Sequence, residues 1–227
     1  MDKFIFGAYW GSRAETMYEV ADKILYTLEG LVEQDDQFLK WYQPGISRKK
    51  ALEKVVFVRK EEIIELLKKN TLKKEINEEG YSEFGFHISL WTGHEDYFSA
   101  SLSFGVGHSF NNPNLGNRLV LTIPSKGHSR ERLLKFEKAK SIVELFAEIW
   151  HPDYAVLTSE MLRDIMGVGN KIGWITYTKF IKQIQQSSKF FMCETKDGCW
   201  IYLNPENYGY GVNAANKLID VKSNLLP

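Results

Sequence analysis

The stretch FIFGAYWGSRAE, residues 4–15, has the pattern of a strand that leads directly into a helix. Alternate residues from Phe4 to Trp10 are apolar, which is the period of a half-buried strand. Ser12 and Glu15 then have the spacing of a capping box, in which each side chain satisfies a backbone N–H at the start of a helix. The residues that follow share one helical face: Met17, Val20, Ala21, Ile24, Leu25, Leu28 and Leu31. We therefore predict an amphipathic helix directly after the first strand.

Strict alternation of apolar and polar residues also marks two strands in the middle of the chain. Residues 84–91 and 97–106 each have apolar side chains at their even-numbered positions. Residues 92–96 between them are typical of a hairpin loop. We predict that the two segments pair antiparallel, with Trp91 opposite Tyr97. Their even-numbered apolar side chains are expected to pack under the helices, with the other face polar.

The rest of the chain alternates helical patterns with short strand patterns. A second long helix is predicted over residues 130–150, because its apolar residues track one face and Pro152 follows it. The remaining predicted elements are strands at 119–123, 153–157, 173–177, 190–194 and 200–203, and helices at 47–54, 61–69 and 213–221. The predicted fold class is α+β, with an antiparallel or mixed sheet packed against two long helices. The sequence contains no linker or repeat, so we expect a single domain over residues 1–227.

The composition argues against several classes of protein. Lys and Arg number 29 and Asp and Glu number 29, so the zero net charge gives no global attraction to nucleic acid or to a membrane. No apolar run approaches the roughly 20 residues that span a bilayer. The start of the sequence lacks the form of a signal peptide. Cys193 and Cys199 are therefore expected to be reduced thiols in the cytoplasm.

Neither a metal nor a nucleotide cofactor is expected. The five histidines are spread along the chain, and no ligand spacing joins them to each other or to the two cysteines. The glycines of residues 167–173 follow a helical segment instead of a strand, which favours a turn over a phosphate-binding loop. We predict no cofactor-binding residue and no metal ligand.

One pair of residues suggests hydrolysis. In the predicted hairpin register His87 lies opposite Ser101, as a base beside a nucleophile would. The orienting carboxylate is missing, because Glu83 would lie two pairs along the strand, and no glycine elbow surrounds the serines. Serines on the solvent face of a strand are ordinary. We therefore expect no catalytic residue, and a hydrolase that uses His87 and Ser101 is an alternative.

Charge is divided between two neighbouring segments. Residues 15–36 hold seven acidic side chains against one lysine, and residues 40–60 hold seven basic side chains against one glutamate. Either the two segments lie close together and neutralise each other, or one of them meets a partner. A nucleic-acid-binding alternative would use cations of the second segment and of the second long helix. They are Arg48, Lys49, Lys50, Arg130, Arg132 and Lys135.

The acidic residues of the first helix form a continuous stripe opposite its apolar face. The stripe consists of Glu15, Glu19, Asp22, Tyr26, Glu29 and Glu33. Like charges one turn apart cost a helix about 0.2–0.5 kcal/mol per pair. Glu29 and Glu33 also lie near the negative end of the helix dipole. A stripe that disfavours its own helix, with a tyrosine at its centre, indicates a docking face; a plain solvated face is the alternative.

Four blocks of sequence occur in a fixed order along the chain. They are GAYWGSRAE at 7–15, FLKWYQPGISRKKAL at 38–52, WHPDYAVLTS at 150–159, and Gly173 and Trp174 with Tyr177. In these blocks the chain resembles the immunity protein 52 family of bacterial polymorphic toxin systems. The resemblance implies an inhibitor of a secreted toxin, often a nuclease of restriction-endonuclease type, and not an enzyme. It implies no membrane and no direct nucleic-acid contact, and the acidic stripe would then dock on the toxin. The sequence leaves the oligomeric state open.

Overall fold

The computed structural model describes residues 2–109, 116–167, 172–180, 190–203 and 209–224. Its strands are β1 (Phe4–Trp10), β2 (Trp41–Tyr42), β3 (Val55–Val56), β4 (Phe86–Trp91), β5 (Ser101–Val106), β6 (Asn117–Thr122), β7 (Tyr154–Ser159), β8 (Ile175–Thr178), β9 (Phe190–Thr195) and β10 (Gly198–Leu203). Its helices are α1 (Met17–Gln34), α2 (Arg48–Leu52), α3 (Lys60–Asn70), α4 (His128–Leu133), α5 (Phe136–Trp150), α6 (Glu160–Met166) and α7 (Val212–Asn224). The described strands form one sheet in the order β3-β2-β4-β5-β6-β1-β7-β8-β10-β9, and its pairings are antiparallel. The α+β class is confirmed.

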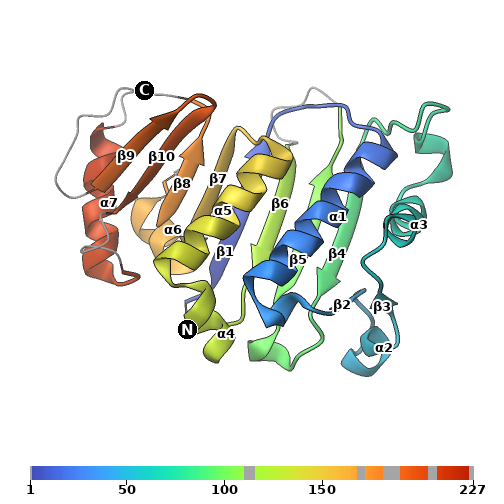
Figure 1. Cartoon of the computed structure of the whole chain (residues 1–227), viewed down its shortest axis with the longest axis horizontal. Coiled ribbons are helices and arrows are strands. Elements are labelled where there is room, and N and C mark those ends of the chain that lie inside the picture. Colours follow the sequence, from blue (N-terminus) through green and yellow to red (C-terminus); the bar gives the residue numbers. More distant parts are fainter. Residues whose placement is uncertain (1, 110–115, 168–171, 181–189, 204–208, 225–227) are drawn as a thin grey trace.

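β1 lies inside the sheet between β6 and β7, and α1 follows it in the chain (Figure 1). α1 and α5 lie side by side across one face of the sheet (Figure 1). Trp150 of α5 joins the two layers. Its ring stacks on Trp10 of β1 with 5.4 Å between centroids, and its indole N–H donates to the Thr27 hydroxyl of α1 at 2.9 Å. The core is therefore the layer between these helices and the sheet.

The sheet is covered differently at its two ends. The even-numbered residues of β4 and β5 are buried, as the alternation predicts, whereas His87, Ser89 and Ser101 are exposed on the other face. In β10 the consecutive residues Ile201, Tyr202 and Leu203 are all buried, so both faces are covered there. We call the exposed surface of β4 and β5 the open face.

The predicted hairpin register is wrong by four residues. β4 and β5 pair with Trp91 opposite Ser101, not opposite Tyr97. A short 3-10 helix inside the loop makes the loop longer than its composition indicated. Thr92 closes this loop, because its N–H donates to the Ala100 carbonyl at 3.0 Å and its hydroxyl accepts from the Ala100 N–H at 2.9 Å.

Two aromatic residues that the alternation placed in the sheet lie outside it. Phe84 precedes β4, and Phe98 belongs to the 3-10 helix; they are 52% and 46% exposed. Gly85 has a φ of 72°, a left-handed conformation that glycine adopts without strain and that a regular strand does not contain. β4 therefore begins at Phe86.

The helix predicted over residues 130–150 is interrupted. α4 ends at Leu133 and α5 begins at Phe136, because Lys135 adopts an extended conformation with ψ of 136° as the N-cap of α5. The Tyr210 hydroxyl donates to the Leu134 carbonyl, which satisfies an acceptor at the end of α4.

Most of the shorter elements agree with their predictions. Ser47 caps α2, since its hydroxyl accepts from the Lys50 N–H at 3.3 Å. α3 buries Ile63, Leu66 and Leu67. β9 and β10 form the predicted hairpin. No described helix combines the length and the apolar character needed to cross a bilayer.

Candidate functional site

Glu15 does not belong to the exposed stripe in which the sequence pattern placed it. It precedes α1, whose N-cap is Thr16, and only 5% of it is exposed. Its carboxylate accepts from the Lys23 ammonium and lies 3.3 Å from the Arg13 guanidinium. The predicted capping box of Ser12 and Glu15 is therefore wrong, because the helix begins one turn later, after Thr16. Glu15 forms ion pairs with Arg13 and Lys23 instead.

Glu19 belongs to the capping box that the structure does contain. The Thr16 backbone N–H donates to Glu19 Oε2 at 2.8 Å, and the Glu19 N–H donates to the Thr16 hydroxyl at 3.2 Å. The hydrogen bonds from the Thr16 backbone and then from its hydroxyl hold the pKa of Glu19 below its ordinary value. Glu19 is exposed, so it adds negative charge to the surface at the helix end where the dipole favours it.

Asp22 is paired with a cation of α3. Its carboxylate lies 2.6 Å from the Lys60 ammonium, and α3 packs along α1. The two side chains are 38% and 39% exposed, and a pair this exposed is worth about 0–1 kcal/mol. Among the described residues, Lys60 is thus the one cation of the basic segment 40–60 that forms an ion pair with the acidic stripe.

Tyr26, Glu29 and Glu33 are exposed on α1, and the tyrosine is 57% exposed. In the described part of the chain no cation pairs with Glu29 or Glu33. Tyr18, which the charge pattern did not identify, adds a second aromatic ring to this helix and is 52% exposed. We call the surface formed by Glu19, Tyr26, Glu29 and Glu33 the acidic face.

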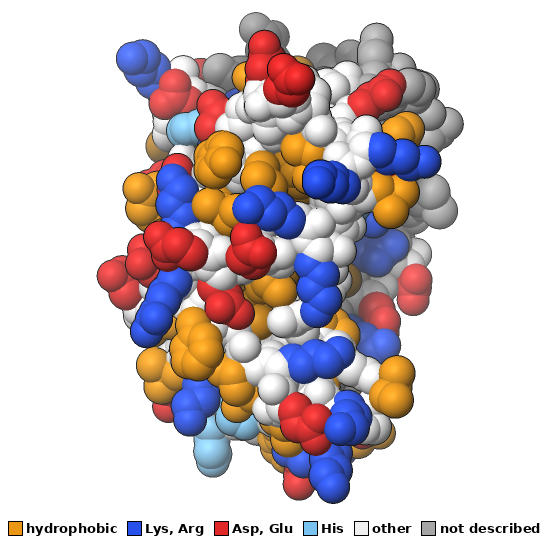
Figure 2. All heavy atoms as spheres, turned by 90° about the vertical axis from the view of Figure 1, so that its right-hand side faces the viewer, with side chains coloured by type: hydrophobic (Ala, Val, Ile, Leu, Met, Phe, Trp, Pro, Cys, Tyr) orange, Lys and Arg blue, Asp and Glu red, His pale blue; other side chains and the backbone are white. Residues whose placement is uncertain are grey.

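Basic side chains gather at the end of the molecule that holds α2 and α3. Figure 2 looks onto this end and shows Lys and Arg in a band through its right half, with a group of Asp and Glu to the left of centre. The exposed cations of these two helices and of the segments after them are Arg48, Lys49, Lys50, Lys54, Arg59, Lys68, Lys69, Lys73 and Lys74. The opposite charges of the sequence therefore occupy neighbouring surfaces.

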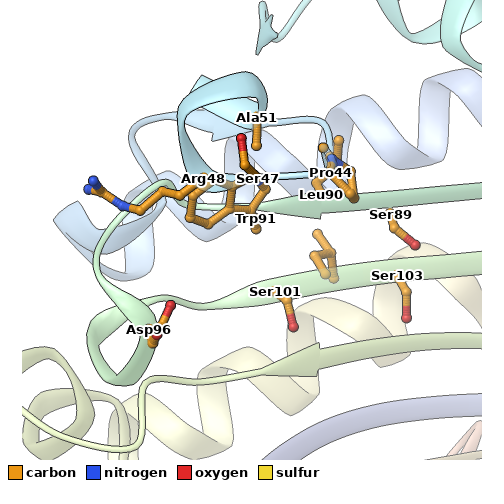
Figure 3. Close-up of a pocket in the computed structure, with 12 residues that line it drawn as sticks. Pro44, Ser47, Arg48, Ala51, Ser89, Leu90, Trp91, Asp96, Ser101 and Ser103 are labelled. Carbon is orange, nitrogen blue, oxygen red and sulfur yellow. The ribbon is translucent and has the colours of Figure 1, made fainter. Parts of the chain in front are cut away.

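A hollow of about 490 Å³ lies on the open face beside α2 (Figure 3). Ser89 of β4, Ser101 and Ser103 of β5, and Ser47 and Arg48 at the start of α2 line it (Figure 3). Its lining is completed by Pro44, Gly45, Ala51, Leu90, Trp91, Asp96 and Leu102. The lining is therefore more apolar than polar, and its polar groups are the serine hydroxyls, the Arg48 guanidinium and the Asp96 carboxylate.

The structure does not bring His87 and Ser101 together. His87 lies opposite Gly105, and Ser101 lies four residues away on β5, opposite Trp91. At about 3.4 Å per residue this separates them by roughly 13 Å along the strand. A base and the group it deprotonates need to be about 3 Å apart. The hydrolase alternative therefore has no geometric basis at this pair.

Two of the cations assigned to the nucleic-acid alternative hold the fold together. Arg132 donates to both carboxylate oxygens of Asp35, at 2.7 and 2.8 Å. The Arg130 guanidinium lies over the Phe4 ring, 4.6 Å from its centroid. Lys135 is exposed at the N-cap of α5. The predicted basic set is thereby reduced to the exposed cations of α2 and Lys135.

The two cysteines are free thiols. Cys193 lies opposite Trp200, so these two side chains share one face of the sheet. Cys199 is adjacent to Trp200 in β10 and therefore points to the other face. Burial raises the pKa of Cys199 to about 11, so this thiol is protonated at neutral pH. Within the described residues, no group of His, Cys, Asp and Glu is placed to hold a metal ion.

Residues 2–187 match the sequence model of the family described as Immunity protein 52. The chain belongs to this family. The resemblance predicted from the four sequence blocks is therefore confirmed. The solved structure of a Pseudomonas aeruginosa T6SS protein, PA0821, is similar over 97% of this chain and 73% of that chain, with 12% sequence identity and a TM-score of 0.49. No curated protein matches the chain.

The sequence blocks that resemble the family place their tryptophans in the core. Trp10, Trp41, Trp150 and Trp174 are each at most 5% exposed. The acidic face lies between the first and second blocks and belongs to neither.

Proposed function

We propose that this protein protects a toxin-producing bacterium by binding the cognate toxin in the cytoplasm and covering the toxin's active site or substrate surface. Membership of the Immunity protein 52 family is the observation that carries the proposal. Inhibition by occlusion requires a complementary surface with a few anchoring residues and no proton transfer. The separation of His87 from Ser101 is consistent with such a mechanism.

The acidic face is the surface that we assign to the toxin. Glu29 and Glu33 repel each other one turn apart on α1, and no described cation offsets them. A basic surface on the toxin would relieve this repulsion and add complementary charge. The exposed ring of Tyr26 lies among these carboxylates and supplies the apolar contact that holds a complex once it has formed.

A nuclease is the class of toxin that fits such a face. A nuclease must present cationic side chains to the phosphates of its substrate. Carboxylates arranged around an aromatic ring offer the negative charge and the stacking surface that a nucleic-acid strand offers. The acidic face would then compete with the substrate for the same groove. Its charge would also steer the toxin towards it, an effect that salt weakens.

Co-expression with the candidate toxin of the adjacent gene tests the proposal. We expect this protein to restore growth of cells that make the toxin. The double variant Glu29→Lys with Glu33→Lys should slow association by about tenfold or more at low salt, within the range that steering spans. The matched control is Asp164→Lys with Glu194→Lys, which changes the net charge equally on exposed residues of α6 and β9.

Tyr26→Ala separates anchoring from steering. We expect this variant to dissociate faster with little change in the association rate, because an aromatic ring that becomes buried in the complex acts after the encounter. His87→Ala and Ser101→Ala should protect as well as the wild type. Failure of the wild type to rescue growth overturns the proposed function. Rescue by the Glu29→Lys and Glu33→Lys variant with unchanged low-salt affinity would place the binding site elsewhere.

A further inference from the structure

β4 has a free edge beyond the end of β2. The two strands pair at one position, Tyr42 opposite Trp91. Gln43 turns its N–H to the other side, where it donates to the Lys54 carbonyl at 3.0 Å. Backbone groups alternate in direction along a strand, so Pro44 is the next residue that would face β4. Proline has no N–H to donate, and the pairing of β2 with β4 ends there.

The free edge presents the backbone groups of His87 and Ser89. The Thr92 N–H donates to the Ala100 carbonyl of the neighbouring chain segment, so the even-numbered residues of β4 direct their backbone groups towards β5. The odd-numbered residues His87 and Ser89 direct theirs to the opposite side. In the described part of the chain no backbone group bonds to them on that side. An N–H and a carbonyl of each residue are therefore placed to pair with a further strand.

A hollow of about 410 Å³ lies along this edge. α3 contributes Leu66 and Lys69 to its lining, the segments that flank α2 contribute Pro44 and Lys54, and β4 contributes His87 and Ser89. We call the hollow and the free edge together the β4 notch. The unpaired backbone and the space beside it coincide, as the addition of a strand requires.

We propose that the β4 notch binds an extended, carboxylate-bearing segment of a partner protein, which adds to the sheet as a strand beside β4. The notch is lined by Lys54 and Lys69, and none of its lining residues is acidic. Each ammonium bonds only weakly to a neutral oxygen, Lys54 to the Pro44 carbonyl at 3.4 Å and Lys69 to the Gln43 side chain at 3.3 Å. Both positive charges are therefore available to carboxylates of the added segment.

The charge also explains the choice of partner. Lysines beside a free edge discourage the pairing of ordinary uncharged strands, which protects the chain from aggregation. An acidic segment overcomes this barrier and an uncharged one does not. A DNA strand would satisfy the lysines, but its sugar–phosphate backbone offers no donors for the carbonyls of His87 and Ser89. The inference is independent of the identity of the toxin and of the role of the acidic face.

A blocked peptide of alternating glutamate and valine tests the notch by nuclear magnetic resonance on the full chain. We expect the backbone amide signals of His87 and Ser89 to shift, and their hydrogen exchange to slow, as the peptide is added. The same peptide with lysine in place of glutamate should not bind. A glutamate peptide methylated at every backbone nitrogen should not bind either, because it has no N–H to pair with the edge.

Two protein variants separate charge from backbone pairing. Lys54→Glu with Lys69→Glu should lower the affinity for the glutamate peptide by about tenfold, because attractive surface contacts become repulsive. The control Lys49→Glu with Lys73→Glu changes the net charge equally at exposed residues outside the notch, and it should alter affinity by less than about threefold. Ser89→Pro removes one outward N–H and leaves the bonds to β5 in place, so it should abolish binding.

Three outcomes would overturn the proposal. The first is equal binding of the methylated peptide, because backbone pairing would then play no part. The second is an equal loss of affinity in the two lysine variants. The third is binding of a short oligothymidylate at the notch when the glutamate peptide does not bind. If Ser89→Pro does not fold, the methylated peptide still tests backbone pairing on the unaltered protein.

Discussion

Glu15 is a carboxylate that the fold buries between two cations. The Arg13 guanidinium, 3.3 Å from it, also donates to the Trp150 carbonyl at 2.7 Å and lies over the Trp10 ring. Lys23 donates to Glu15 from the second turn of α1. These contacts join the end of β1, the start of α1 and the end of α5 around a single charge.

Neutralising Glu15 should destabilise the protein. Glu15→Gln leaves Arg13 and Lys23 without a buried counter-charge, and we expect it to cost about 1–3 kcal/mol, as for other buried polar groups that lose a partner. Glu29→Gln is the control, because Glu29 is exposed, and it should change stability by less than about 0.5 kcal/mol. Urea unfolding measures both. Equal effects of the two substitutions would show that the Glu15 cluster contributes nothing to stability.

Asp35 should make stability depend on pH. Its burial opposes ionisation, but hydrogen bonds from Arg132 and from the Gln37 backbone outweigh burial and hold the pKa of Asp35 below its ordinary value. A carboxyl group whose pKa falls on folding stabilises the native state above its unfolded pKa. That stabilisation is lost as the pH drops through the folded pKa.

We expect the free energy of unfolding to fall as the pH drops below about 4, the ordinary aspartate value. Asp35→Asn should be less stable than the wild type at neutral pH and should lose less stability on acidification. Asp164→Asn, at an exposed position, should keep the slope of the wild type. Urea unfolding at a series of pH values measures these slopes. A wild-type slope for Asp35→Asn would contradict the assignment.

At the scale of the element, Thr16 fixes where α1 begins. Its hydroxyl accepts from the Glu19 N–H, and Glu19 returns the interaction to the Thr16 backbone. Thr16→Ala should cost about 0.5–2 kcal/mol, the usual range for loss of an N-cap. Ser12→Ala should cost less than about 0.5 kcal/mol, because Ser12 is exposed and lies outside the helix. Thermal or urea unfolding compares them, and the reverse order would restore the capping box expected from the sequence.

Periodicity predicted the elements better than the joins between them. The alternation in β1 and in β4 records burial of every second side chain, which is a local property of the sequence. The register of β4 and β5 depends on a loop closed by Thr92, and the glycine and aspartate of residues 92–96 indicated a shorter loop. The break at Lys135 has no proline or glycine signal, and the carbonyl of the preceding residue, Leu134, accepts from the hydroxyl of Tyr210, far away in the sequence.

At the scale of the whole molecule, the sheet is continuous from β3 to β9. Trp41 lies near one end of it and Trp174 near the other, and both are fully buried. We expect Trp41→Ala and Trp174→Ala each to cost about 3–5 kcal/mol and to lower one shared transition. Circular dichroism and tryptophan fluorescence should give coincident midpoints. A Trp174→Ala protein that unfolds in two separate steps would show that the single domain expected from the sequence is wrong.

The acidic face was only partly predictable. The spacing of the acidic residues correctly placed Glu29 and Glu33 on the exposed side of α1. It could not show that Glu15 is buried. Arg13 lies beside Glu15 and also donates to the carbonyl of Trp150, which belongs to a helix far away in the sequence. It also could not show that Lys60 pairs with Asp22, because that depends on how α3 packs along α1.

The sequence by itself determined the family, the α+β class, the antiparallel central strands and the apolar face of α1. These follow from residue spacing, because side-chain direction repeats with a fixed period in a strand or a helix. Tertiary structure alone decided the register of β4 and β5, the burial of Glu15, the separation of His87 from Ser101 and the free edge of β4. Each of these depends on which distant segments meet in space, and residue spacing within one segment does not encode that.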